Sequence, residues 1–224
     1  MDSAKISNEF YENLGADGLA GLKGFTNQSD VAAVVRAVTP MLSPCDRIVD
    51  LACGYGRVTL PLAAAGYRIE GIDLASTMIK AAKNNARKRK LNVKFLCGDM
   101  RDLPYQDASR TMVLCFWSSF NHLLTRADQL KTLNELHRVL KSGGMAFLEM
   151  DNGERKYLRT LLRLAGTGAD HRILRHPIRD LQIVDYIHDR ATLRSLCRAS
   201  KFRRWTVAFK NIGKKRRIVM VLYK

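Results

Sequence analysis

The sequence of 224 residues predicts an α/β fold with seven short strands in one mostly parallel sheet and helices on both of its faces. Two observations lead to this prediction. Between residues 30 and 150, short apolar runs alternate with stretches of helical periodicity, as in parallel strands joined by crossover helices. Near the end of the chain, two strand-like runs are separated only by residues 211–216, a connection that suits antiparallel strands alone. The sheet should therefore end in a hairpin.

Five helices are expected from apolar spacing and capping signals. Ser29 or Asp30 can cap the first helix and Ser76 the third, whose far end is basic, as suits the negative end of a helix dipole. Glycines at 143–144 should stop the fourth helix in a left-handed turn. The helices are expected at residues 30–38, 57–65, 77–90, 126–140 and 189–199.

The strands are read from short apolar runs bounded by turn residues. The fourth run is nearly all apolar, which indicates a strand covered on both faces. The last two runs form the expected antiparallel hairpin. The strands are expected at residues 47–52, 68–72, 93–97, 111–117, 145–150, 205–210 and 217–223.

Composition argues against several classes of protein. No apolar run approaches the ~20 residues that span a bilayer, and the acid-containing start of the chain does not resemble a targeting signal. The five cysteines contain no C-x-x-C pair and the five histidines do not cluster with carboxylates, so we expect neither a disulfide framework nor a metal site. We expect a cytoplasmic protein with one domain over residues 1–224, as a monomer or homodimer.

The net charge of +17 is concentrated late in the chain: residues 151–224 contain 19 Lys and Arg against 6 Asp and Glu, a net +13. Such a surface is compatible with phosphate-rich partners and equally with a plain solvated surface.

A turn rich in small residues follows the first strand, with the sequence Asp50-Leu51-Ala52-Cys53-Gly54-Tyr55-Gly56. A helix N-terminus after such a turn offers backbone N–H groups to a ligand, and glycine lets the ligand approach closely. Alone, the pattern also fits a simple tight connection. Asp73 and Asp99 follow the next two strands, where carboxylates can bind a ribose and an adenine amino group. Each has a plainer interpretation, as a helix cap or a turn residue. Together, the three positions favour a nucleotide site at the carboxyl edge of the sheet.

Four segments resemble motifs of the class I S-adenosylmethionine-dependent methyltransferase family: 49–57 (VDLACGYGR), 71–78 (GIDLASTM), 98–103 (GDMRDL) and 140–144 (LKSGG). The resemblance implies a Rossmann-like sheet with the terminal hairpin and S-adenosylmethionine as cofactor. In a dinucleotide-binding G-x-G-x-x-G turn, the third position would be glycine, but here it is Thr59.

The resemblance also implies roles for individual residues. Asp50, Ala52, Gly54 and Gly56 would lie beside the methionine moiety, Asp73 would hold the ribose, and Asp99 and Met100 would flank the adenine. The cofactor contacts expected in full are Tyr11, Asp50, Ala52, Cys53, Gly54, Gly56, Arg57, Asp73, Leu74, Met78, Gly98, Asp99, Met100, Phe116, Trp117, Ser118 and His122.

Three parts of the single domain are implied in the same way. Residues 1–28 would form an N-terminal lid that includes Tyr11 and Phe25, residues 29–150 the cofactor-binding half, and residues 151–224 the substrate-side and C-terminal half. By position, residues 161–188 could line the acceptor pocket.

The segment 116–122 (FWSSFNH) should form the wall of the acceptor site, because it combines aromatic surface with small polar groups. It resembles the corresponding segment of small-molecule N-methyltransferases. His122 is a candidate general base and Asn121 an orienting residue; His122 could instead pack near the cofactor or cap a helix. Asp151 and Asn152 face the same edge.

The function expected is methyl transfer to an amine or hydroxyl of a small molecule by in-line displacement. The alternative is an RNA- or nucleotide-modifying methyltransferase, favoured by the basic C-terminal part but lacking the Asn/Asp-Pro-Pro-aromatic tetrapeptide of enzymes that methylate nucleic-acid amino groups. A third possibility is a protein that binds the cofactor without turnover.

Overall fold

A computed structural model describes residues 2–22, 28–155, 160 and 172–224 of the chain. The helices are α1 (Ser3–Ala20), α2 (Gln28–Val38), α3 (Thr59–Ala64), α4 (Ser76–Lys88), α5 (Arg126–Val139) and α7 (Arg190–Ala199), with short 3-10 turns η1 (Thr39–Met41) and η2 (Ser119–His122). The strands are β1 (Ile48–Leu51), β2 (Ile69–Asp73), β3 (Phe95–Cys97), β4 (Arg110–Cys115), β5 (Leu140–Met150), β6 (Ile173–Ile178), β7 (Leu181–Tyr186), β8 (Arg204–Ile212) and β9 (Lys215–Tyr223).

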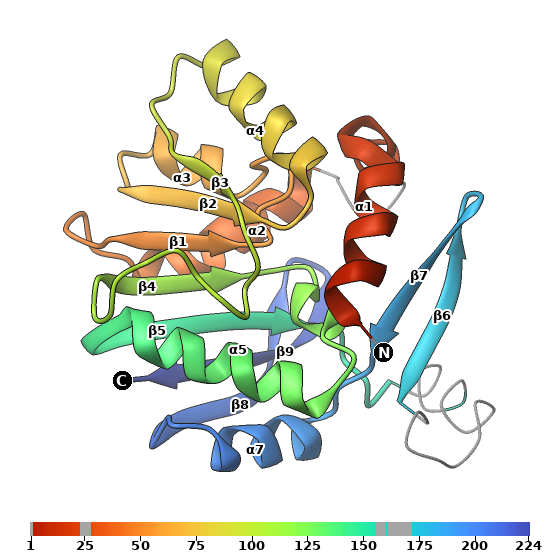
Figure 1. The fold of residues 1–224 in the computed structure, drawn as a ribbon. Coiled ribbons are helices and arrows are strands. Elements are labelled where there is room, and N and C mark those ends of the chain that lie inside the picture. Colours follow the sequence, from red (N-terminus) through yellow and green to blue (C-terminus); the bar gives the residue numbers. More distant parts are fainter. Residues whose placement is uncertain (1, 23–27, 156–159, 161–171) are drawn as a thin grey trace.

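Seven strands form the central sheet in the order β3-β2-β1-β4-β5-β9-β8 (Figure 1). The first five are parallel to one another, and β9 runs antiparallel to both β5 and β8. The predicted fold class is therefore confirmed, with the terminal hairpin. The strand order reverses between β1 and β4, and ligands bind at such a point in open α/β sheets.

Helices cover both faces of the sheet, because alternate residues of each strand face opposite sides. On one face, Val113 and Leu148 pack against Leu133 of α5 and Leu196 of α7. On the other face, the α2 and α3 side chains pack against a second set that includes Leu114 and Phe147. This double cover explains why the central strands are almost entirely apolar.

Two predicted helix ends differ in the structure. Ser76 is the first residue of α4 rather than its cap, and the Glu12 carboxylate of α1 accepts the Ser76 N–H at 2.5 Å and the Thr77 N–H at 3.3 Å. Helix α5 ends at Val139, before the glycines, because Leu140 already pairs with Arg110 in the sheet.

Three further elements were not predicted. The N-terminal segment contains helix α1, and residues 173–186 form the hairpin β6–β7. Figure 1 shows α1 between α4 and β7, on the side of the sheet where the parallel strands end. No helix in the described ranges is long and apolar enough to cross a membrane.

Candidate active site

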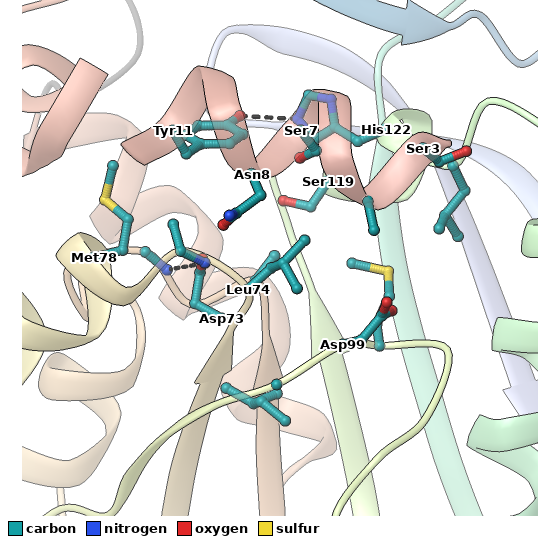
Figure 2. Close-up of a pocket in the computed structure, with 18 of the residues that line it drawn as sticks. Ser3, Ser7, Asn8, Tyr11, Asp73, Leu74, Met78, Asp99, Ser119 and His122 are labelled. Carbon is teal, nitrogen blue, oxygen red and sulfur yellow. Dashed lines mark hydrogen bonds between the residues drawn. The ribbon is translucent and has the colours of Figure 1, made fainter. Parts of the chain in front are cut away.

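A cavity opens at the carboxyl edge of the sheet, beneath α1. Figure 2 shows α1 running across it, with Ser7 and Tyr11 on one side and Asp73 and Asp99 on the other. Loops that follow β1, β2 and β4 line the cavity. The cavity therefore lies at the reversal of strand order and at the carboxyl edge of the sheet, and the sequence predicts the nucleotide site at that edge.

The loop after β1 exposes backbone to this cavity. Gly54 and Gly56 both have left-handed backbone angles, with φ of +55° and +85°. Among the described residues, a β-carbon at Gly54 would meet only Leu19, at 3.9 Å, whereas one at Gly56 would approach Phe95 to 3.2 Å. Gly54 therefore leaves room for a ligand, and Gly56 permits close packing beneath the turn.

Asp73 ends β2 with its carboxylate fixed by backbone groups. Its Oδ2 accepts the Gly54 N–H at 2.8 Å, and its Oδ1 accepts the Ala75 N–H at 3.0 Å. Each oxygen keeps lone-pair capacity for a ligand hydroxyl. Burial raises the pKa of Asp73, although the two backbone hydrogen bonds oppose the rise.

Arg101 connects the loop after β3 to the start of α1. Its Nε donates to Asp99 Oδ2 at 3.0 Å, its Nη2 donates to the same oxygen at 2.7 Å, and its Nη1 donates to Asp128 at 2.8 Å. Asp128 also accepts the Ser3 hydroxyl at 2.7 Å. The Asp99 loop and helix α1 are therefore held by one network.

Asp50 lies behind the cavity wall. Its side chain is buried and accepts the Thr59 hydroxyl at 2.6 Å. Burial raises the pKa of Asp50 from 3.8 to about 7, against the lowering effects of Thr59 and Arg57. The folded state therefore favours the protonated carboxyl up to near-neutral pH.

We expect the Asp50→Asn variant to gain stability relative to the wild-type chain as the pH rises. An acid with a higher pKa in the folded state binds more protons there, so its contribution to stability falls between about pH 4 and about pH 7. Asparagine does not titrate and can still accept the Thr59 hydroxyl. Urea unfolding at about pH 4.5 and about pH 8 measures the difference; a difference independent of pH would contradict a raised pKa.

The segment after β4 forms another wall of the cavity. Trp117 and Ser118 have φ of +52° and +63°, a conformation that costs non-glycine residues roughly 1–3 kcal/mol and needs support from its surroundings. Glu149 provides it by accepting the Trp117 N–H at 2.7 Å. The Arg57 guanidinium stacks on the Trp117 ring, 3.6 Å from its centroid, and both residues line the cavity.

Tyr11 and His122 meet where α1 crosses the cavity. The Tyr11 hydroxyl lies 2.8 Å from His122 Nε2 (Figure 2). The other ring nitrogen, Nδ1, lies 3.1 Å from the Asp185 carboxylate on β7. Burial lowers the pKa of His122, but Asp185, the Val184 carbonyl and Asp73 together outweigh it, so the net pKa is raised. The pair can exchange a proton with a bound molecule.

Comparison with known proteins gives these residues a context. Residues 48–144 match the profile of a family described as a methyltransferase domain. The chain is 34% identical to a Bacillus subtilis protein named as a methyltransferase, over 46% of this chain and 42% of that protein. It is 31% identical to the glycine/sarcosine N-methyltransferase of Aphanothece halophytica, over 47% of this chain and 40% of that enzyme. It thus spans less than half the length of either relative.

The chain therefore contains a segment, residues 48–144, that matches the methyltransferase-domain family, and its sheet has the Rossmann-like methyltransferase fold. The magnesium protoporphyrin IX methyltransferase of Synechocystis, solved with bound S-adenosylmethionine, has the same fold, with a TM-score of 0.68 at 15% identity over 100% of this chain and 98% of that one. The cofactor of that enzyme is the one that the sequence motifs of this chain imply.

The cavity has groups that suit S-adenosylmethionine. Asp73 presents two fixed oxygens to a diol, as a ribose requires. The amide oxygen of Asn8 is buried with no hydrogen-bond partner among the described residues, on a helix that lines the cavity. A buried polar atom without a partner is costly unless a ligand or water satisfies it.

The expected cofactor contacts fall into two groups. Those that line the cavity are Tyr11, Ala52, Gly54, Arg57, Asp73, Leu74, Met78, Gly98, Asp99, Met100, Trp117 and His122. Those outside its lining are Asp50, Cys53, Gly56, Phe116 and Ser118, and the candidate orienting residue Asn121 is also outside it. The remaining lining residues were not among the expected cofactor contacts, and half of them come from α1; Ser119 belongs to the expected acceptor wall. They are Ser3, Ala4, Ser7, Asn8, Leu19, Ile72, Ala75, Arg101, Ser119 and Leu123.

Physical reasons account for several of these placements. The side chain of Phe116 points to the far face of the sheet and packs on Phe147, because it alternates with the residues before it. The Ser118 hydroxyl is used in a hydrogen bond behind the cavity wall, where it accepts the Asp151 N–H at 2.8 Å. Phe25 and residues 161–171 lie outside the described residues. Within those described, no group of three or more potential ligands is arranged to hold a metal ion.

Proposed function

We propose that this chain transfers a methyl group from S-adenosylmethionine to an amine or hydroxyl of a small molecule by in-line displacement. The observation that supports this most strongly is the cavity itself, in which Asp73 and Asp99 lie across from Tyr11 and His122 of the opposite wall. A site with both a nucleotide-binding side and a proton-accepting side suits this reaction. A small amine is the substrate that the name of the Aphanothece halophytica relative states.

The residues of the chain would act mainly by positioning. S-adenosylmethionine supplies an electrophilic methyl group on its sulfonium. Residues 2–22 contribute the lid helix α1, whose Ser3 and Glu12 are bonded to α5 and α4 respectively. A closed lid excludes water and holds the acceptor in line with the methyl group, and such positioning accounts for much of the rate in two-substrate reactions. We propose that residues 1–224 work as one domain in this way.

Transfer of labelled methyl into a fractionated cell extract tests the proposal. The full chain is incubated with S-adenosylmethionine labelled in its methyl group, and the products are separated into small molecules, protein and RNA. We expect the label in the small-molecule fraction. Label found only in RNA or protein would contradict the proposed acceptor class, and no label in any fraction would contradict turnover.

RNA as the acceptor remains the second candidate because of the basic C-terminal part. Several of its cations are engaged within the fold. Arg217 is buried, Lys215 pairs with Asp30 at 3.1 Å, and the Arg216 guanidinium lies 4.3 Å from the centroid of the Phe209 ring. These contacts leave fewer charges for phosphates, which supports the small-molecule proposal.

Retention on immobilised RNA separates the two candidates. We expect weak retention at low ionic strength, with little further loss as salt is added. Strong retention that falls steeply with salt is the signature of released counterions and would support the RNA alternative.

A further inference from the structure

Three side chains from separate segments form a hydrogen-bonded chain at the cavity. Tyr11 comes from α1, His122 from η2 and Asp185 from β7. The phenol oxygen lies 2.8 Å from His122 Nε2, and His122 Nδ1 lies 3.1 Å from Asp185 Oδ1. The side chains of His122 and Asp185 are only 11% and 15% exposed. The three groups are therefore close and largely shielded from water.

The partners of His122 determine where its hydrogen lies. Nδ1 faces two acceptors, the Asp185 carboxylate and the Val184 carbonyl at 3.5 Å, and so must carry the hydrogen in a neutral ring. Nε2 is then an acceptor, and the hydroxyl of Tyr11 donates to it. The phenol oxygen retains lone pairs for an N–H or O–H from the cavity.

The charges around these three side chains agree with this arrangement of hydrogens. Burial raises the pKa of Tyr11, as do Asp185 and Asp73, while Arg57 opposes the rise. Tyr11 is therefore neutral and cannot hold a negative charge for long. His122 faces Asp185 on β7 and Asp73 on β2, and both carboxylates stabilise its protonated form. When Tyr11 receives a proton, its own proton can therefore pass to His122, whose protonated form the two carboxylates stabilise.

We propose that Tyr11, His122 and Asp185 form a proton relay that deprotonates the methyl acceptor, with Asp185 as the positioning residue. This rests on the proposed function. The N–H or O–H proton of the acceptor passes to the Tyr11 oxygen as the Tyr11 proton passes to His122 Nε2. The acceptor's lone pair forms the new bond to the methyl carbon, and the electron pair of the broken C–S bond stays on sulfur. Asp185 stabilises the resulting imidazolium and holds the ring in the orientation that the transfer needs.

The first test is the tautomer of His122, which needs no acceptor. Nitrogen-15 NMR of the full chain should show a neutral ring with hydrogen on Nδ1. In the Asp185→Asn variant, the amide can donate to Nδ1, and we expect the hydrogen to move to Nε2. The control Asp180→Asn, on the exposed turn of the same hairpin, should leave the tautomer unchanged. Hydrogen on Nε2 in the wild-type chain would overturn the proposal.

The second test uses the small-molecule fraction of a cell extract as acceptor and labelled S-adenosylmethionine as donor. Tyr11→Phe should slow transfer by about 10²-fold or more, the contribution typical of a general base. Its affinity for the cofactor should fall by no more than about tenfold, the effect of one lost hydrogen bond. Tyr67→Phe, which removes a hydroxyl at the opposite edge of the sheet, is the matched control and should transfer at the wild-type rate.

The pH profile distinguishes a relay from a merely structural contact. Transfer by the wild-type chain should rise to a plateau as His122 loses its proton. Asp185→Asn removes a charge that raises the pKa of His122, so the pH profile of this variant should shift to lower pH. Its plateau rate should also be lower than that of the wild type. If the wild-type chain transfers the methyl group and the Tyr11→Phe variant does so at the same rate, the relay is overturned but the proposed function is not. Cofactor binding with no transfer by the wild-type chain would contradict the proposed function, and the relay with it.

Discussion

Replacing Asp73 with alanine is expected to weaken S-adenosylmethionine binding by about 10²-fold, measured by isothermal titration calorimetry. The carboxylate is proposed to accept both ribose hydroxyls, and a hydrogen bond to a charged group contributes about 1.5 kcal/mol or more. Two such bonds correspond to about two factors of ten. The variant also leaves the N–H groups of Gly54 and Ala75 without their acceptor, which loosens the turn that faces the cofactor.

Two further variants make this result interpretable. Asp73→Asn keeps the size of the side chain and one acceptor, so its affinity should lie between those of the wild type and Asp73→Ala. Asp180→Ala removes a carboxylate from an exposed turn and should bind as the wild type does. Thermal unfolding of each variant shows whether it is folded. A folded Asp73→Ala protein with wild-type affinity would contradict the placement of the ribose.

Arg217→Met is expected to lower the free energy of unfolding by about 3–5 kcal/mol, the cost of leaving a buried charge, here the carboxylate of Glu149, without its partner. Arg217 is buried between the carboxylates of Glu149 and Asp151, and its Nη2 donates to the Ser118 hydroxyl at 2.9 Å. Methionine fills similar space but satisfies neither carboxylate. Because Glu149 also holds the Trp117 N–H, the loss should extend to the wall of the cavity.

Lys215→Met gives the matched comparison on the same strand. Lys215 pairs with Asp30 at 3.1 Å, but its side chain is 43% exposed. Exposed ion pairs contribute about 1 kcal/mol or less, so this variant should lose little stability. Urea unfolding measures both variants. Equal losses of unfolding free energy in the two variants would show that the ion pairs of Arg217 contribute no more to stability than an exposed pair.

The order of strands and helices was predictable because it depends on local patterns. The apolar run of β1 is buried on both faces, and the predicted gap of six residues before the last strand permits only a hairpin. The ends of elements depended on distant residues instead. Glu12 supplies the capping carboxylate of α4 from 64 residues away, and Arg110 draws Leu140 into the sheet. Neither contact leaves a signal near the affected residue.

The same distinction applies to the candidate site. Gly54, Asp73 and Asp99 follow successive strands, so the topology alone brings them to one edge. Asp185 could not be assigned, because β6–β7 shows little periodicity and its approach to His122 is a tertiary contact. The N-terminal segment was expected to cover the site, but without its helical form the lining contributed by Ser7 and Asn8 could not be foreseen.

A crystal structure of the chain with S-adenosylhomocysteine tests the central claim most directly. We predict the ligand in the cavity beneath α1, with its ribose hydroxyls on Asp73, its adenine beside Asp99, and its sulfur facing the Tyr11–His122 side. A ligand bound elsewhere on the protein, or in this cavity with its ribose away from Asp73, would contradict the account.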